Sequence, residues 1–93
     1  MYKRVITPRA KRSLKTLPVA IRLSLIEATE ALEHNPYSGK KLTGSLYFLY
    51  SFHFKIKNVD YRVAYTIDDA RKLIIIHLAH SRENFYKKLR RLF

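Results

Sequence analysis

The sequence predicts an α+β fold in which an N-terminal strand and a helical hairpin pack on a twisted antiparallel sheet. A C-terminal helix comes after the last strand of the sheet. Two observations indicate this class. Apolar residues recur at helical spacing in the first third of the chain, and from residue 47 they alternate with polar ones. The 93 residues suffice for one modest core, and no low-complexity or linker segment divides them. We therefore expect a single domain over residues 1–93.

The N-terminal third is predicted to form a short strand and two helices. Residues 2–6 have strand character, and Thr7 is a suitable N-cap for a helix that starts with proline. This helix is expected over residues 8–17, because Pro18 interrupts it. The second helix is expected to end at Asn35, before a proline. Its apolar residues repeat at helical spacing: Ile21, Leu25, Ala28 and Leu32.

Three strands in a meander are predicted next, over residues 47–57, 61–67 and 73–79. In the first two, apolar side chains alternate with polar ones, so that one face belongs to the core. The third is almost continuously apolar, which is typical of an interior strand. The closing helix follows Ser81, which can cap it. Three of its residues can anchor it to the sheet: Phe85, Leu89 and Leu92.

Charge is the strongest global signal in the sequence. Nineteen Lys and Arg residues against seven Asp and Glu give a net charge of +12. Such a field favours nucleic acid as the first expected partner and an acidic protein as the second, and a merely solvated basic surface is the alternative. No membrane partner is expected, because no apolar run, residues 73–76 included, is long enough to cross one. The lack of cysteine suits the cytoplasm and excludes a disulfide framework.

Two cations are expected to face one another on the polar side of the sheet. If residues 58–59 form a two-residue turn, Lys55 lies opposite Arg62, and His53 lies opposite Ala64. Like charges at opposed positions destabilise a strand pair by about 0.2 to 1 kcal/mol, and an anion bound between them relieves this repulsion. Two long side chains that fan into solvent explain the pattern equally well.

Three segments carry a resemblance to a known family. NPYSGKKLTG at residues 35–44, DYRVAY at 60–65 and SRENFY at 81–86 occur in an order and spacing that resemble the RelE/ParE superfamily of bacterial and archaeal toxins, specifically its RelE-like members. The resemblance covers nearly the whole chain. It implies a fold similar to microbial ribonucleases and the activity of a ribosome-dependent mRNA endonuclease. It also implies three partners, namely the ribosome, mRNA and a cognate antitoxin in a hetero-oligomer.

The resemblance also implies a set of catalytic residues. Lys55 matches a lysine of the family's second strand, Arg62 matches the arginine of a Tyr-Arg pair, and Arg82 and Tyr86 match the residues that close the family pattern. His53 stands where the best-known RelE-like toxins carry another basic residue. The arginines are suited to hold the scissile phosphate, and His53, with an ordinary pKa near 6.5, to serve as acid. Tyr86 is suited to stack on a base or move a proton, and Lys55 to act as a base or a charge stabiliser.

No metal or cofactor is expected, so the predicted enzyme is a metal-independent endoribonuclease. The four histidines show no ligand spacing supported by acids, and His77 in an apolar strand is better explained as a packed or hydrogen-bonded residue. Two other functions stay open. A ParE-like inhibitor of DNA gyrase shares the scaffold, although Lys55, Arg62 and Tyr86 together argue against it. A non-catalytic RNA-binding module fits poorly with the N-terminal strand and two helices.

Overall fold

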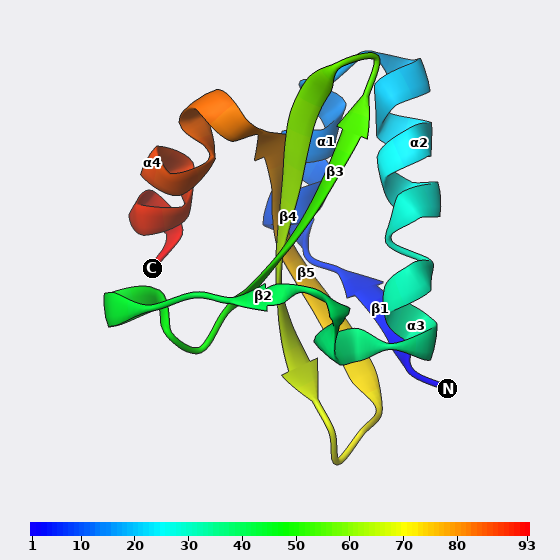
Figure 1. Cartoon of the computed structure of the whole chain (residues 1–93), viewed down its shortest axis with the longest axis vertical. Coiled ribbons are helices and arrows are strands. Elements are labelled where there is room, and N and C mark those ends of the chain that lie inside the picture. Colours follow the sequence, from blue (N-terminus) through cyan, green and yellow to red (C-terminus); the bar gives the residue numbers. More distant parts are fainter.

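The chain forms one five-stranded sheet with helices on both of its faces (Figure 1). A computed structural model describes residues 1–93. The elements, with η denoting a short 3-10 helix, are β1 (Lys3–Ile6), α1 (Pro8–Lys15), α2 (Val19–Ala28), α3 (Ala31–His34), η1 (Pro36–Ser38), β2 (Lys40–Lys41), η2 (Gly44–Leu46), β3 (Tyr50–Ile56), β4 (Val59–Asp68), β5 (Leu73–Ser81) and α4 (Arg82–Leu92). The α+β class expected from the sequence is confirmed.

The sheet is antiparallel except at one edge. Its strands lie in the order β1-β5-β4-β3-β2. β1 pairs in parallel with β5, from Lys3 opposite Leu73 to Ile6 opposite Ile76. The N-terminal strand thus extends the sheet at the edge away from β2, and β5 becomes an interior strand, as its continuous apolar sequence predicts.

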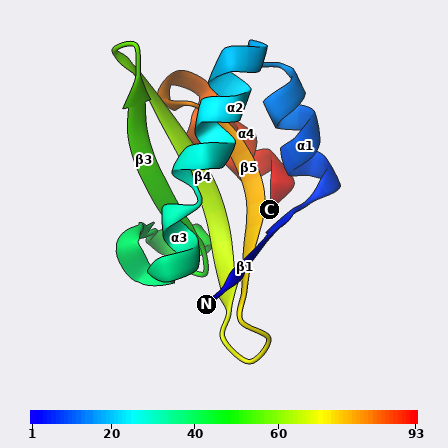
Figure 2. The same cartoon turned by 90° about the vertical axis from the view of Figure 1, so that its right-hand side faces the viewer.

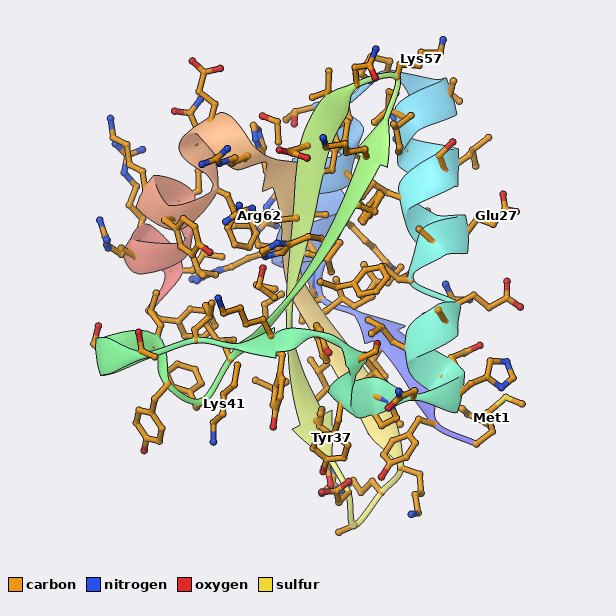
Figure 3. All side chains as sticks on the ribbon, in the orientation of Figure 1. Met1, Glu27, Tyr37, Lys41, Lys57 and Arg62 are labelled. Carbon is orange, nitrogen blue, oxygen red and sulfur yellow. The ribbon has the colours of Figure 1, made fainter.

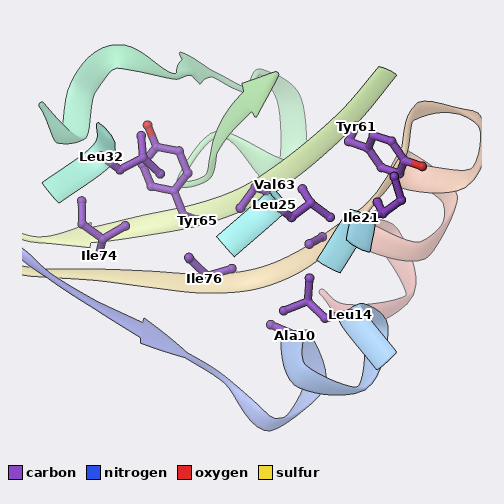
Figure 4. Packing of buried hydrophobic residues seen from close by; sticks show 11 residues of the cluster. Ala10, Leu14, Ile21, Leu25, Leu32, Tyr61, Val63, Tyr65, Ile74 and Ile76 are labelled. Atoms are coloured by element: carbon purple, nitrogen blue, oxygen red, sulfur yellow. The ribbon is translucent and has the colours of Figure 1, made fainter. Parts of the chain in front are cut away.

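The larger core lies between the sheet and the N-terminal helices (Figures 2 and 4). The apolar side chains that repeat at helical spacing in α1, α2 and α3 meet the inward side chains of β4 and β5. The buried residues of this core include Ala10, Leu14, Ile21, Leu25 and Leu32 from the helices and Tyr61, Val63, Tyr65, Ile74 and Ile76 from the strands. Burial of one large apolar side chain contributes about 1.5 to 3 kcal/mol, so this core dominates the stability of the fold.

A second, smaller core fixes α4 to the opposite face of the sheet. Phe85 and Leu89 are fully buried against Leu49, Ala64 and Leu78, and Leu92 packs at the margin of the cluster. The predicted anchoring of the closing helix is confirmed. The predicted side-chain cap is wrong: Ser81 holds the N-cap position, but its hydroxyl lies 3.2 Å from Nδ1 of His80 and makes no cap hydrogen bond.

The second predicted helix is broken into α2 and α3. The carbonyl oxygen of Ile26 accepts hydrogen bonds from the Thr29 hydroxyl at 2.8 Å and from Nη1 of Arg4 at 2.5 Å. These side-chain donors take the place of the backbone N–H of Glu30, which bonds at 3.1 Å to the carbonyl of Glu27. The helix ends here because side-chain hydrogen bonds compete with its regular backbone pattern.

The turn between β3 and β4 lies one residue earlier than expected. Lys57 and Asn58 have positive φ angles of 51° and 68°, as both central residues of a type I′ hairpin turn do. Val59 belongs to β4 because a β-branched residue strongly disfavours positive φ. The expected opposition of Lys55 to Arg62, and with it that of His53 to Ala64, is therefore wrong.

The observed register changes the neighbours of the basic residues. His53 lies opposite Arg62, and Lys55 lies opposite Asp60, so that Lys55 faces an opposite charge. β3 also starts at Tyr50 instead of residue 47, because the preceding segment forms η2 with Gly44 at a φ of 68°.

Candidate active site

Three basic side chains form a row across the middle of the sheet. His53 of β3 lies opposite Arg62 of β4, and Arg62 lies opposite His80 of β5. Residues at opposed positions project from the same face of a sheet. This is the face that α4 covers, because Tyr86 of α4 contacts Arg62 directly. The row therefore lies at the junction of the sheet with the closing helix.

Arg62 is held by a tyrosine of the closing helix. Its Nη1 atom donates a hydrogen bond of 2.8 Å to Oη of Tyr86, and its guanidinium carbon lies 5.3 Å from the centre of the Tyr86 ring. Figure 3 shows Arg62 between β4 and α4. The Nε atom of Arg62 is buried and has no hydrogen-bond partner. One side-chain hydrogen bond leaves most of the five guanidinium donors for an incoming anion.

A groove of about 650 Å³ opens beside Arg62 and Tyr86. It lies between α4 and the segment from β2 to η2, which passes beneath α4 in Figure 1. No acidic residue lines it. Its basic and titratable lining residues are Lys40, Lys41, His53, Arg62, Tyr86 and Arg90. Such a concentration of one sign of charge attracts and orients an anionic chain.

Tyr65 fixes β2 beside the groove. The buried Tyr65 hydroxyl donates a hydrogen bond of 2.7 Å to the carbonyl of Pro36 and accepts one of 3.0 Å from the N–H of Gly39. Burial raises the pKa of Tyr65 to about 12, so the hydroxyl stays protonated. A side chain at Gly39 would collide with that hydroxyl. Glycine therefore allows the close approach that places Lys40 and Lys41 at the groove.

His53 is suited to accept a proton. Partial burial of its ring lowers its pKa below the ordinary value, and the charges of Arg62 and Lys40 lower the pKa further. Its Nε2 atom lies 2.9 Å from the hydroxyl of the buried Ser51, which orients the ring. A histidine with a lowered pKa is neutral at pH 7, which favours the role of general base over that of the acid expected from its ordinary pKa.

The groove gathers only part of the catalytic set predicted from the sequence. Lys55 is exposed opposite Asp60 and does not line the groove. Arg82 is exposed at the start of α4, beside a separate cavity that Asp60 and Glu83 also line. The positive charge of Arg82 still helps to lower the pKa of His53. Catalytic roles for these two outer residues stay predictions, whereas three predicted residues meet at the groove: His53, Arg62 and Tyr86.

Three basic residues of the groove were not identified from the sequence. Arg90 lies one helical turn after Tyr86, so the four-residue spacing was a usable signal. Lys40 and Lys41 belong to a two-residue strand that no periodicity marks. Their position depends on the tertiary contact between Gly39 and Tyr65, which is not visible in the sequence.

No group of three or more His, Asp or Glu side chains is arranged to hold a metal ion.

The predicted hydrogen-bonding role of His77 is confirmed, because its Nε2 atom lies 2.9 Å from Oγ1 of Thr66. Burial lowers the pKa of His77 and keeps the ring neutral.

No helix has both the length and the apolar character that crossing a membrane requires.

The family of the chain follows from comparison with known proteins. Residues 5–90 match the model of a family described as the ParE-like toxin of the type II bacterial toxin-antitoxin system. This match covers nearly the whole chain, so the chain belongs to that toxin family, within the RelE/ParE superfamily that its motifs resemble. The recognition made from the sequence is confirmed. No curated protein sequence matches the chain.

Solved structures of RelE toxins share the fold. The toxin-antitoxin complex RelBE2 from Mycobacterium tuberculosis contains a chain with 29% identity and a TM-score of 0.78, covering 87% of this chain and 98% of that one. The archaeal RelE-RelB complex from Pyrococcus horikoshii gives 25% identity, a TM-score of 0.63 and coverages of 88% and 96%. A free mutant of the E. coli toxin RelE gives 15% identity, a TM-score of 0.74 and coverages of 99% and 98%, and shows the fold alone.

Proposed function

We propose that the chain is a ribosome-dependent mRNA endonuclease that inhibits translation. One observation carries the proposal: Arg62, held by Tyr86 and adjacent to His53, opens into a groove lined by further cations and by no acid. This arrangement supplies the two requirements of RNA cleavage by the neighbouring 2′-oxygen, which are stabilisation of a phosphate that becomes more negative and a group that removes a proton.

Arg62 binds the scissile phosphate in this mechanism. Its remaining guanidinium donors form charge-assisted hydrogen bonds to the phosphate oxygens, which strengthen as negative charge develops. The Tyr86 hydroxyl and ring hold the guanidinium in place. Lys40, Lys41 and Arg90 draw the adjoining phosphates into the groove.

His53 and Tyr86 move the protons. Neutral His53 takes the proton of the 2′-hydroxyl, and the 2′-oxygen forms a bond to phosphorus while the bond from phosphorus to the 5′-oxygen breaks. Oη of Tyr86 accepts its hydrogen bond from Arg62, so its own proton is free for the departing 5′-oxygen. Each role is filled by a side chain, and the proposed chemistry is independent of a metal.

The ribosome supplies the alignment that the chain lacks. Attack on phosphorus needs the 2′-oxygen opposite the leaving 5′-oxygen, and flexible RNA bound by charge alone does not hold that geometry. mRNA on a translating ribosome advances one codon at a time and is held in a constrained backbone. We therefore expect free RNA to bind the chain and stay intact.

We further propose that a cognate antitoxin controls this activity in the cytoplasm, where translating ribosomes lie. Two observations support the partner. The structures from Mycobacterium tuberculosis and Pyrococcus horikoshii are toxin-antitoxin complexes. The chain also carries a net charge of +12, which favours rapid association with an acidic segment. The expected assembly is a hetero-oligomer of toxin and antitoxin.

Cell-free translation in the presence of the purified chain tests the nuclease. The 5′ ends of the mRNA are mapped by primer extension, and an identical mRNA without a start codon serves as the untranslated control. We expect cuts at codon spacing on the translated message only. Arg62→Ala should slow cleavage by about 100-fold to 1000-fold, the usual effect of removing a transition-state donor. Arg91→Ala removes an exposed charge of α4 outside the groove and should cut like the wild type.

The other candidate functions give different results in the same experiment. Intact mRNA together with inhibited DNA gyrase supercoiling would identify a ParE-like gyrase inhibitor. Intact mRNA with active gyrase and strong RNA binding would identify a non-catalytic RNA-binding module. A loss smaller than tenfold in Arg62→Ala would make Arg62 peripheral to cleavage.

A further inference from the structure

Three aromatic side chains form an exposed ridge beside the groove. Tyr47, Phe48 and Phe93 are 64%, 40% and 53% exposed. The ring of Phe48 contacts the other two rings edge to face. Its centre lies 6.0 Å from the centre of the Tyr47 ring and 5.2 Å from that of the Phe93 ring. The ring of His77, in β5, packs edge to face against Phe93, with 5.4 Å between the ring centres. We call Tyr47, Phe48 and Phe93 the aromatic ridge.

The aromatic ridge lies between two basic hollows. On one side, Tyr47 directly follows η2, and η2 and Arg90 form part of the wall of the catalytic groove. On the other side, Phe93 lines a second cavity of about 350 Å³, whose charged residues are Arg9 and Arg12 of α1. Arg9 ties α1 to the end of α4 through a hydrogen bond of 3.4 Å from its Nη1 atom to the carbonyl of Leu92. The C-terminus lies close to the segment between β2 and β3 in Figure 1.

The chemistry of this surface selects its ligand. No acidic side chain lines either cavity, so the charged side chains on both sides of the aromatic ridge favour a polyanion. Exposed aromatic rings beside a basic track bind single-stranded nucleic acid, because unpaired bases stack on the rings while the phosphates follow the cations. An acidic peptide satisfies the cations but has no need of stacked rings.

We propose that the aromatic ridge is a stacking platform for single-stranded RNA outside the catalytic groove. Bases that flank the scissile phosphate stack on Tyr47 and Phe93, and the backbone continues to Arg9 and Arg12 in the second cavity. This inference rests on the proposed function, because it extends the path of the same RNA beyond Arg62. The ridge adds affinity for unpaired bases of any identity and does not select a sequence.

RNA binding by two aromatic variants tests the proposal. Fluorescence anisotropy of a labelled single-stranded RNA with 2′-O-methyl groups, which cannot be cut, is compared with that of a duplex of equal length and charge. Phe93→Leu and Tyr47→Leu keep apolar bulk but remove the stacking face. Each should weaken binding of the single strand by about 5-fold to 100-fold and leave the duplex unchanged. A folding defect would weaken both ligands alike.

Charge variants of α1 supply a matched pair. Arg9→Gln with Arg12→Gln should weaken binding of the single strand and reduce its salt dependence. Lys11→Gln with Lys15→Gln removes the same charge from exposed positions of the same helix that line neither cavity, and should have a smaller effect.

The outcomes separate this inference from the proposed function. Unchanged RNA affinity in the aromatic variants, with translated mRNA still cut, overturns the platform and leaves the nuclease in place. Unchanged RNA affinity with weakened binding of a glutamate-rich peptide assigns the ridge to a protein partner and also overturns it. Ridge-dependent RNA binding without any cleavage of translated mRNA supports the platform and refutes the nuclease.

Discussion

The Nη1 atom of Arg62 lies 2.8 Å from Oη of Tyr86, so a strand in the middle of the sheet and the closing helix share one hydrogen bond. The bond joins residues 24 positions apart in the sequence. Phe85, next to Tyr86, is fully buried against the sheet. Docking of α4 and assembly of the contact between Arg62 and Tyr86 are therefore the same event, and any loosening of α4 separates the proposed phosphate-binding group from its support.

Tyr86→Phe isolates the hydroxyl of this pair. The variant keeps the ring that Arg62 covers and the packing of α4, but it loses the acceptor for Nη1 and the proposed proton donor. A hydrogen bond to a charged group contributes about 1.5 to 3 kcal/mol, so cleavage of translated mRNA should slow by about tenfold to a hundredfold. Rates come from primer extension at fixed toxin concentration.

The same variant should stay folded, because its buried packing is unchanged, and its free energy of unfolding in urea should fall by no more than about 1.5 to 3 kcal/mol, which is the contribution of this hydrogen bond. Tyr37→Phe, which removes an exposed hydroxyl that bonds Asp69 outside the groove, is the matched control and should cut at the wild-type rate. Full cleavage activity in Tyr86→Phe would exclude the hydroxyl from the mechanism.

Arg62→Lys separates charge from geometry. Lysine keeps the positive charge but cannot present two parallel N–H groups to a phosphate or bond Tyr86 from the same position. We expect RNA affinity close to that of the wild type and cleavage slower by about tenfold to a hundredfold. The two quantities are measured by anisotropy on uncleavable RNA and by mapping of translated mRNA. Equal rates for lysine and arginine would show that a point charge suffices.

Cleavage should lose rate in acid through protonation of His53. Its pKa lies below the ordinary value of about 6.5, first through burial and then through Arg62 and Lys40. A general base acts only when neutral, so the rate should be constant above pH 6.5 and fall as the pH drops through the lowered pKa. Single-turnover cleavage on isolated ribosome-mRNA complexes between pH 5 and pH 8 gives the profile.

His53→Gln should be slow at every pH and lack the acidic decline. His34→Gln, which changes an exposed histidine of α3 away from the groove, should keep the wild-type profile. A rate that rises as the pH falls below 6.5 would instead make protonated His53 the acid.

Periodicity predicted what depends on many residues together. The apolar repeats of α1 and α2, the alternation in β3 and β4 and the anchoring by Phe85 and Leu89 all follow from burial of a continuous face. The motif around Arg62 and the motif around Tyr86 indicated two residues that the fold brings into contact. These features tolerate an error of a residue or two at the end of an element.

Features decided by a single contact were not predictable. The register of β3 and β4 depends on which two residues take positive φ, and a shift of one position replaced Lys55 by His53 as the neighbour of Arg62. The break after α2 depends on Arg4, which reaches from β1 to the carbonyl of Ile26. Each of these contacts joins segments whose proximity no local pattern records.

Gly39→Ala should displace β2 and thereby disrupt the groove that β2 lines. The new methyl group would collide with the hydroxyl of Tyr65 and come within 3.0 Å of the carbonyl oxygen of Ser51. Tyr65 is fully buried and cannot move aside without losing its hydrogen bonds to Pro36 and Gly39. Overpacking of this kind costs about 1 to 3 kcal/mol, so the free energy of unfolding in urea should fall by that amount.

Cleavage should fall in the same variant even at temperatures where it is folded, because a displaced β2 moves Lys40 and Lys41 away from the groove. Ser38→Ala, one residue earlier and exposed, should match the wild type in both measurements. Binding of uncleavable RNA completes the test: its affinity should drop in Gly39→Ala, because the two lysines are lost as phosphate contacts. Wild-type stability and RNA affinity in Gly39→Ala would show that β2 is free to shift and that the contact between Gly39 and Tyr65 does not position the groove.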